Sequence, residues 1–233
     1  MSQQATLLAK VFDHKEHADA FLTEGRISAG RLSSYRDTED SERRDTDEGG
    51  VILLEPSVWV NGIELPGVKR LRFDDGYEQV RYVFCMTQFF VDLNDPSALE
   101  QLGEQMAMSL PRLQRFGPHT VLVHDLSEFT DRVKEAIPSR VKAWKWGFVE
   151  YCDESLSAQT MNLHLQDPMS ALERAFRKDP FFELERECRL ALCDGEGGDV
   201  DRIDFAVGSL EDIALMMPTS GLGDARFTSE EPE

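Results

Sequence analysis

Residues 181–192 read FFELERECRLAL and form the most informative segment of the chain. Because neighbouring side chains of a β-strand point to opposite faces, a strand here would sort these residues into two sets. One face would carry Leu184, Cys188, Leu190 and Leu192, with Arg186 as an exception, and the other Glu183, Glu185, Glu187 and Arg189. Carboxylates beside a guanidinium suit a cleft that handles charge better than they suit a core.

The same segment allows two plainer interpretations. It could be a strand with one solvated face, or an amphipathic helix that begins after Pro180. In that helix the apolar stripe would consist of Phe181, Leu184, Cys188 and Leu192. The pattern alone leaves these alternatives open, so the rest of the chain must decide between them.

Length and composition predict one globular domain over residues 1–219 and a polar, disordered acidic tail over residues 220–233. The chain has 233 residues, of which 41% are hydrophobic, and this is enough for a sizeable core. The four cysteines lack a C-x-x-C spacing and are expected to be reduced thiols, so no metal site is expected from them. The polar start and the lack of a long apolar segment predict a cytoplasmic protein with no membrane partner.

The formal net charge of −19 restricts the partners of the chain. Such a charge weakens nonspecific attachment to nucleic-acid phosphate and repels anionic membranes. It could attract a basic protein partner, and it leaves open a nucleic-acid substrate bound through a local basic patch.

The order of patterns along the chain predicts an α+β fold with mostly antiparallel or mixed sheets and scattered helices. Asp13 could cap a first helix that Gly25 ends, and a strand is expected over residues 26–35. Further strands are expected over residues 7–12, 51–60, 62–73, 77–90, 119–124, 141–152 and 203–207. Further helices are expected over residues 96–110, 125–137 and 168–177 and from Ser209 to before Pro218.

Three local features resemble the ADP-ribosyltransferase-like fold, especially a bacterial group of uncharacterised domains associated with phage defence and toxin systems. The Glu185-x-Glu187-x-Arg189 pattern follows an aromatic residue and is similar to a late strand of that group, with Lys178 as its upstream basic residue. The strand end at residues 84–87 is similar to its central small-polar motif. The first helix and the strand after it resemble its first unit.

The resemblance implies an enzyme that uses NAD as a substrate and transfers ADP-ribose to an acceptor, either a protein or a nucleic acid. Cleavage of the nicotinamide–ribose bond passes through an oxocarbenium-like state that a carboxylate stabilises. Glu187 is implied in this catalytic role, and Glu185 would orient or deprotonate the acceptor. The residues implied to bind the dinucleotide are Arg26 or Arg31 for the pyrophosphate, Tyr35 or Tyr82 for nicotinamide, Thr87 and Arg189.

Two other classes of function remain open at this point. A non-enzymatic protein could use its acidity to capture a basic partner or to mimic nucleic acid. A metal-dependent hydrolase could use the acids of the loop over residues 37–48, although a solvated loop is the favoured interpretation. An enzyme needs Glu185, Glu187 and an arginine of the first strand to face one cleft, whereas a mimic needs acids spread over a convex surface.

Overall fold

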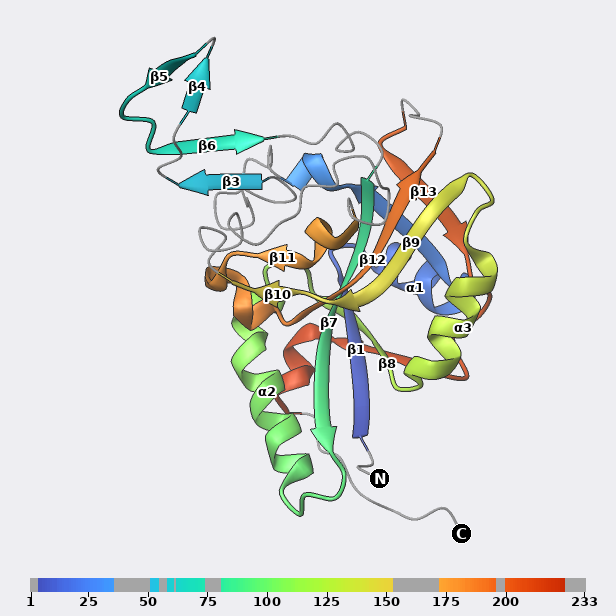
Figure 1. Cartoon of the computed structure of the whole chain (residues 1–233). Helices are drawn as coiled ribbons and strands as arrows, with labels where there is room; N and C mark the ends of the chain where they lie inside the picture. Colours follow the sequence, from blue (N-terminus) through green and yellow to red (C-terminus); the bar gives the residue numbers. More distant parts are fainter. Residues whose placement is uncertain are drawn as a thin grey trace.

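The fold is built around an antiparallel β-sheet (Figure 1). A computed structural model describes residues 4–35, 51–54, 58–60, 62–73, 81–152, 172–195 and 200–224. Eight strands of this described part form the sheet: β1 (Gln4–Phe12), β2 (Arg26–Arg31), β7 (Arg81–Asp92), β8 (His119–Val123), β9 (Val141–Phe148), β12 (Glu187–Asp194), β13 (Arg202–Ala206) and β14 (Ala214–Pro218). The expected α+β class with mostly antiparallel pairing is confirmed.

Strand β7 is the centre of this sheet and has different neighbours along its two edges. Along one edge, β12 pairs with residues 81–87 of β7, and β9 pairs with the outer side of β12. Along the other edge, β2 pairs with Tyr82 and Val83, whereas β1 pairs with residues 87–92. Within the described chain no strand pairs with residues 84–86 on that second edge, so the sheet splits between β2 and β1.

Helices cover both faces of the sheet. Helices α1 (Lys15–Glu24) and α3 (Leu126–Ala136) lie on one side, and α2 (Ala98–Leu113) lies at the opposite side of Figure 1. The largest core cluster packs Phe21 of α1 and Phe129 of α3 against Phe84, Leu190 and other strand residues. A second cluster joins Met106 of α2 to Phe89 of β7, so apolar burial fixes α2 against the C-terminal half of that strand.

The opposite face of β7 and β12 is covered by short elements. They are the 3-10 helices η1 (Leu32–Tyr35), η3 (Arg174–Phe176) and η4 (Pro180–Glu185), together with the parallel pair β10 (Glu150–Tyr151) and β11 (Arg177–Lys178). Leu172, Ala175 and Phe176 pack there on Val83 and Ala191. These short elements place residues 172–186, which precede β12, against β7.

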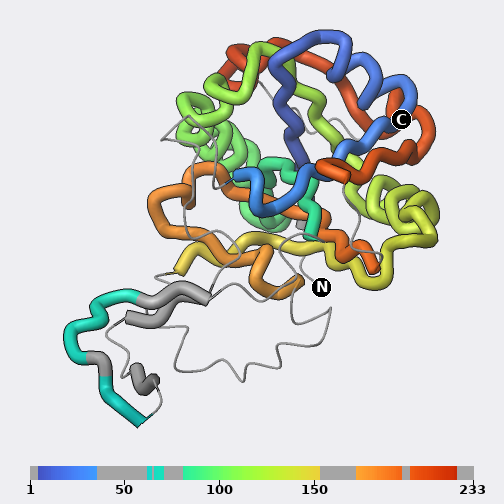
Figure 2. The backbone as a smooth tube through the Cα atoms, turned by 90° about the horizontal axis from the view of Figure 1, so that it is seen from above, coloured from blue at the N-terminus to red at the C-terminus, as the bar shows by residue number. Residues whose placement is uncertain are grey.

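Two small strand pairs lie apart from this body in Figure 1, and the cyan part of the same segment also stands away from the sheet in Figure 2. Strands β3 (Val51–Leu54) and β6 (Arg70–Phe73) form one pair, and β4 (Val58–Val60) and β5 (Ile63–Leu65) form the other. The predicted strands over residues 51–60 and 62–73 are therefore each divided in two. The Asn61-Gly62 and Asp75-Gly76 turn signals and the acidic loop over residues 37–48 fall partly or wholly outside the described residues.

Several predicted elements differ from the structure. The strand over residues 26–35 ends at Arg31, and helix α2 continues through Pro111 to Leu113. The expected helix after Ser209 is instead a turn followed by β14, which pairs with β8. Residues 174–177, expected in a helix, instead form η3 and the first residue of β11. At the C-terminus, Thr219–Asp224 forms the 3-10 helix η5 with Leu222 buried, and residues 225–233 lie outside the described residues.

Candidate active site

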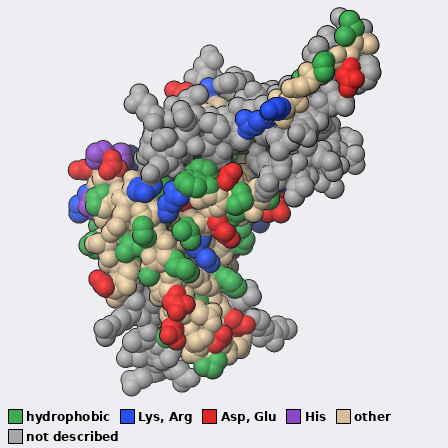
Figure 3. Space-filling view, turned by 90° about the vertical axis from the view of Figure 1, so that its left-hand side faces the viewer, with side chains coloured by type: hydrophobic (Ala, Val, Ile, Leu, Met, Phe, Trp, Pro, Cys, Tyr) green, Lys and Arg blue, Asp and Glu red, His purple; other side chains and the backbone are tan. Residues whose placement is uncertain are grey.

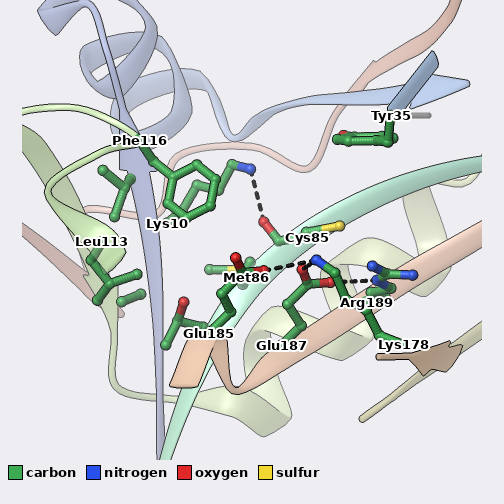
Figure 4. A pocket seen from close by; sticks show the side chains of 13 residues that line it. Lys10, Tyr35, Cys85, Met86, Leu113, Phe116, Lys178, Glu185, Glu187 and Arg189 are labelled. Carbon is green, nitrogen blue, oxygen red and sulfur yellow. Dashed lines mark hydrogen bonds and ion pairs between the residues drawn. The ribbon is translucent and has the colours of Figure 1, made fainter. Parts of the chain in front are cut away.

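A cavity of about 340 Å³ lies at the split in the sheet (Figure 4). Its volume falls in the lower part of the range of about 300–1,000 Å³ that is typical of small-molecule sites. Residues 9–11 of β1 and 85–87 of β7 form its back, and Leu113 and Phe116 form an apolar wall at and after the end of α2. The remaining lining residues are Tyr35, Lys178, Glu185, Glu187 and Arg189.

The Lys10 side chain lies in the gap where β1 separates from β7. After Ala9, β1 leaves β7 and pairs only with β8. The Lys10 ammonium then donates a hydrogen bond of 2.8 Å to the Cys85 carbonyl oxygen and lies 4.6 Å from the centre of the Phe84 ring. A cation therefore lines the cavity at the position where the edge of β7 has no paired strand in the described chain.

The two glutamates reach the cavity through a tight turn rather than along one continuous strand. Residues 180–185 form η4, which the Asp179 carboxylate caps by accepting a hydrogen bond from the Phe181 N–H at 2.7 Å. Arg186 adopts a left-handed conformation with φ of 47°, and β12 begins at Glu187. The prediction of a strand over residues 181–192 is therefore wrong for its first half, because a 3-10 turn occupies that half.

The left-handed turn at Arg186 is held by contacts from distant parts of the chain. Its guanidinium donates hydrogen bonds to the Gln105 side-chain oxygen at 2.8 Å and to the Gln88 carbonyl at 3.2 Å. The Gln88 N–H in turn donates to the Arg186 carbonyl at 2.8 Å. Because a left-handed conformation is unfavourable for a residue with a β-carbon, these tertiary contacts are what stabilise it.

The turn creates a buried cluster of four charged side chains (Figure 4). The Lys178 ammonium lies 2.7 Å from Glu185 Oε2 and 2.6 Å from Glu187 Oε1. Arg189 contacts the other oxygen of Glu187 through its Nε and donates to the Ala175 carbonyl through Nη1. The exposed fractions of Lys178, Glu185 and Arg189 are only 5%, 4% and 1%. Each buried charge thus has an oppositely charged partner.

The surroundings separate the pKa values of the two glutamates. Burial raises the pKa of Glu185 from its ordinary value of 4.5 to about 7, since burial and the neighbouring Glu187 together outweigh the attraction of Lys178. For Glu187, burial acts in the same direction, but Arg189 and Lys178 outweigh it and hold its pKa well below the ordinary value. Glu187 is therefore ionised at neutral pH, whereas Glu185 exchanges its proton near neutrality. Such divergent carboxyl pairs are typical of acid–base sites.

Tyr151 completes the surroundings of the pair. The Glu187 backbone N–H donates a hydrogen bond of 2.7 Å to the Tyr151 hydroxyl. Burial, followed by the charge of Glu187, raises the pKa of Tyr151, so its hydroxyl keeps its proton at neutral pH.

The raised pKa of Glu185 predicts a pH-dependent stability. Folded protein keeps this proton up to about pH 7, whereas unfolded protein loses it near 4.5, so ionisation costs stability as the pH rises between these values. The difference is worth about 3 kcal/mol. Glu185→Gln cannot ionise, so its free energy of unfolding relative to wild type should rise by this amount from about pH 5 to about pH 8. Urea unfolding at a series of pH values measures it, and a constant difference would contradict the assigned shift.

Five of the eight residues implied by the resemblance line the cavity. These are Glu185, Glu187, Thr87, Tyr35 and Arg189, and β12 register places Glu187 opposite Thr87. The two first-strand arginines do not line it. Arg26 is exposed and pairs with Glu24 at 2.7 Å, and Arg31 donates to the Val200 carbonyl at 2.7 Å. Tyr82, the alternative to Tyr35, is buried in the main core and donates to the Val200 carbonyl at 2.9 Å.

Sequence patterns missed Lys10, Leu113, Phe116 and Tyr151. Lys10 had one usable signal, because it interrupts the otherwise apolar run LLAKVF of residues 7–12. Its partner Cys85 lies 75 residues away in the sequence, and only the split sheet brings the two together.

The residues that the structure describes contain neither a cluster of metal ligands nor a membrane-spanning helix. No group of three or more His, Cys, Asp or Glu side chains there could hold a metal ion. Among the described helices, none has the length and apolar composition needed to span a membrane.

Comparisons with known proteins identify no relative of this chain. Searches with protein-family models, curated proteins and solved structures find no match to the chain.

Proposed function

We propose that the cavity at the split of the sheet binds NAD and cleaves its nicotinamide–ribose bond, as an ADP-ribosyltransferase-like enzyme would. The observation that supports this most is the carboxyl pair in a cavity, with Glu187 ionised and the Glu185 pKa near neutrality. Cleavage of a glycosidic bond requires a carboxylate beside the developing cation and a second group that manages the proton of the acceptor.

Glu187 is assigned to the developing charge at the anomeric carbon. Its two oxygens accept bonds from Lys178 and Arg189, and a carboxylate has about four acceptor positions, so a ribose hydroxyl can use a remaining one. With Glu185 protonated the four-residue cluster carries one net positive charge, and with Glu185 ionised it is neutral. The oxocarbenium-like state is therefore tolerated better when Glu185 is ionised.

The cation that meets the pyrophosphate is reassigned from the first-strand arginines to Lys10. Lys10 lines the cavity, whereas Arg26 and Arg31 do not. Figure 4 shows Lys10 with Phe116 and Leu113 on one side of the carboxyl pair and Tyr35 on the other. The rings of NAD could therefore stack on Phe116 at one end of the cavity and on Tyr35 at the other. The volume of about 340 Å³ suits one half of the dinucleotide rather than all of it.

The alternative of an acidic interaction protein gains less support. On the face shown in Figure 3, the acidic side chains of the described residues stand between hydrophobic and neutral ones and do not form one continuous field. Glu185 is buried, the Glu187 side chain is only 10% exposed, and both line one cavity, which a mimic of nucleic acid would not need. An enzyme that consumes NAD would also serve as a toxin or a phage-defence effector.

The proposal is tested by incubating the purified protein with NAD and quantifying free nicotinamide by chromatography. We expect release well above the uncatalysed rate, together with a rise in melting temperature at millimolar NAD, because ligand binding stabilises the folded state. Lys10→Met should raise the KM for NAD with a smaller change in kcat. The absence of both release and stabilisation would favour the interaction protein.

A further inference from the structure

We propose that the acceptor in this reaction is water, so that the protein is an NAD glycohydrolase that releases free ADP-ribose. This inference rests on the proposed function and specifies its substrate class. The residue that must activate the acceptor, Glu185, is placed by η4.

The turn of η4 points its side chains in two opposite directions. Phe181 and Leu184 have exposed fractions of 57% and 47%, and Glu183 is also exposed. Phe182 and Glu185 of the same turn are buried, with exposed fractions of 5% and 4%. The surface that a macromolecular acceptor would meet therefore carries Glu183, while the glutamate beside Glu187 faces inward.

Glu185 is buried, and one of its carboxylate oxygens is already occupied by another side chain. Its Oε2 accepts the Lys178 hydrogen bond at 2.7 Å, and Lys178 is itself packed 4.3 Å from the centre of the Phe182 ring. A general base must come within about 3 Å of the proton that it removes, or act through one water. Because Glu185 is buried and one of its oxygens is held by Lys178, a large acceptor such as an arginine or a nucleobase would reach it less readily than a water molecule, which needs a volume of only about 30 Å³.

The hydrolytic step requires only NAD, a water molecule and the Glu185 carboxylate. The bond between the ribose C1′ and the pyridinium nitrogen breaks, and its electron pair stays with nicotinamide, which leaves as a neutral molecule. Water forms the new C1′–O bond while ionised Glu185 takes its proton, which later passes to solvent. NAD and water thus give ADP-ribose, nicotinamide and one proton, and no oxidant, reductant or metal is consumed.

The experiment is a product balance with NAD that is radiolabelled in its adenylate phosphate. Wild-type protein is incubated with it in the presence of a protein extract and total RNA, and nicotinamide, free ADP-ribose and macromolecule-bound label are quantified. Equal amounts of nicotinamide and free ADP-ribose, without bound label, are expected. Label on protein or RNA that accounts for the missing ADP-ribose would overturn the inference and leave the proposed function standing. No nicotinamide release would overturn both.

A matched pair of variants tests the assignment of the base. Glu185→Gln should reduce hydrolysis about 100-fold or more, the usual effect of a general base. Glu183→Gln, on the exposed side of the same turn, should leave the rate within about twofold, as expected for a surface substitution away from the site. Wild-type activity should rise with pH through about 7, where Glu185 ionises, and the remaining activity of Glu185→Gln should lack this rise. Equal rates of the two variants would exclude Glu185 as the base, and circular dichroism controls for folding.

Discussion

Replacing Lys178 by methionine should lower the free energy of unfolding by about 3–5 kcal/mol, the cost of breaking a buried ion pair. The Lys178 ammonium is within 2.7 Å of both Glu185 and Glu187, and all three side chains are at most one-tenth exposed. Methionine keeps the unbranched chain that packs on Phe182 but supplies no donor. The loss of stability therefore measures the cost of leaving the Glu185 and Glu187 carboxyl groups buried without this partner.

Lys145→Met is the matched control for this change. Lys145 also forms a short ion pair, 2.6 Å from Glu173, and also lies over a phenylalanine ring, that of Phe176 at 5.0 Å. Its side chain is 33% exposed and that of Glu173 is 59% exposed. Because solvent screens such a pair, its removal should cost only about 0–1 kcal/mol. Chemical denaturation compares the two variants, and similar small losses for both would contradict a buried charge cluster at Lys178.

The fold class could be predicted from the sequence because its signals are local. Gly25 ends α1 in a left-handed conformation with φ of 64°, and its N–H donates a hydrogen bond to the Ala20 carbonyl. Asp125 caps α3 by accepting a hydrogen bond from the Glu128 N–H. Both features depend on residues only a few positions apart and on well-known preferences.

The elements that were predicted incorrectly are those that distant contacts decide. Ser209 can begin a helix, but residues 214–218 gain a full set of partners on β8 and become an edge strand, where the terminal Pro218 is tolerated. In residues 181–192 the alternation of charged and apolar residues fits a strand, with Arg186 as the exception. The left-handed Arg186 has no glycine to announce it and depends on Gln88 and Gln105, each more than 80 positions away in the sequence.

The site was predicted in the same uneven way. Glu185 and Glu187 meet in one cavity, as their placement on one charged face of residues 181–192 predicted, although a turn rather than a continuous strand brings them together. The structure does not bring the predicted first-strand arginines to the cavity, since the pairing of β2 directs Arg31 to Val200, whereas Lys10 lines the cavity at the split of β1 from β7. Sheet topology, which no local pattern encodes, decides which of the two cations reaches the cavity.

Glu187→Gln should reduce cleavage of NAD by about 100- to 1,000-fold, the usual effect of removing one group that stabilises charge in the transition state. Glutamine keeps the shape of the side chain but lacks the charge that the cluster directs into the cavity. The effect should fall on kcat rather than on KM, because the charge at the anomeric carbon develops only in the transition state.

This substitution also has a structural cost that must be separated from the catalytic one. Glu187 balances both Lys178 and Arg189, so glutamine leaves two buried cations with one carboxylate and should destabilise the protein. Assays should therefore be made well below the melting temperature of the variant. Glu187→Asp provides a second variant that keeps the charge but shortens the side chain.

The measurement that tests the central claim most directly is the rate of nicotinamide release from NAD by wild type, Glu187→Gln and Glu187→Asp. All three proteins must first be shown to be folded by circular dichroism. The cavity assignment predicts release by wild type, a loss of about 100-fold or more for Glu187→Gln and a partial loss for Glu187→Asp. Equal rates for wild type and a folded Glu187→Gln protein, or no release by any of them, would contradict it.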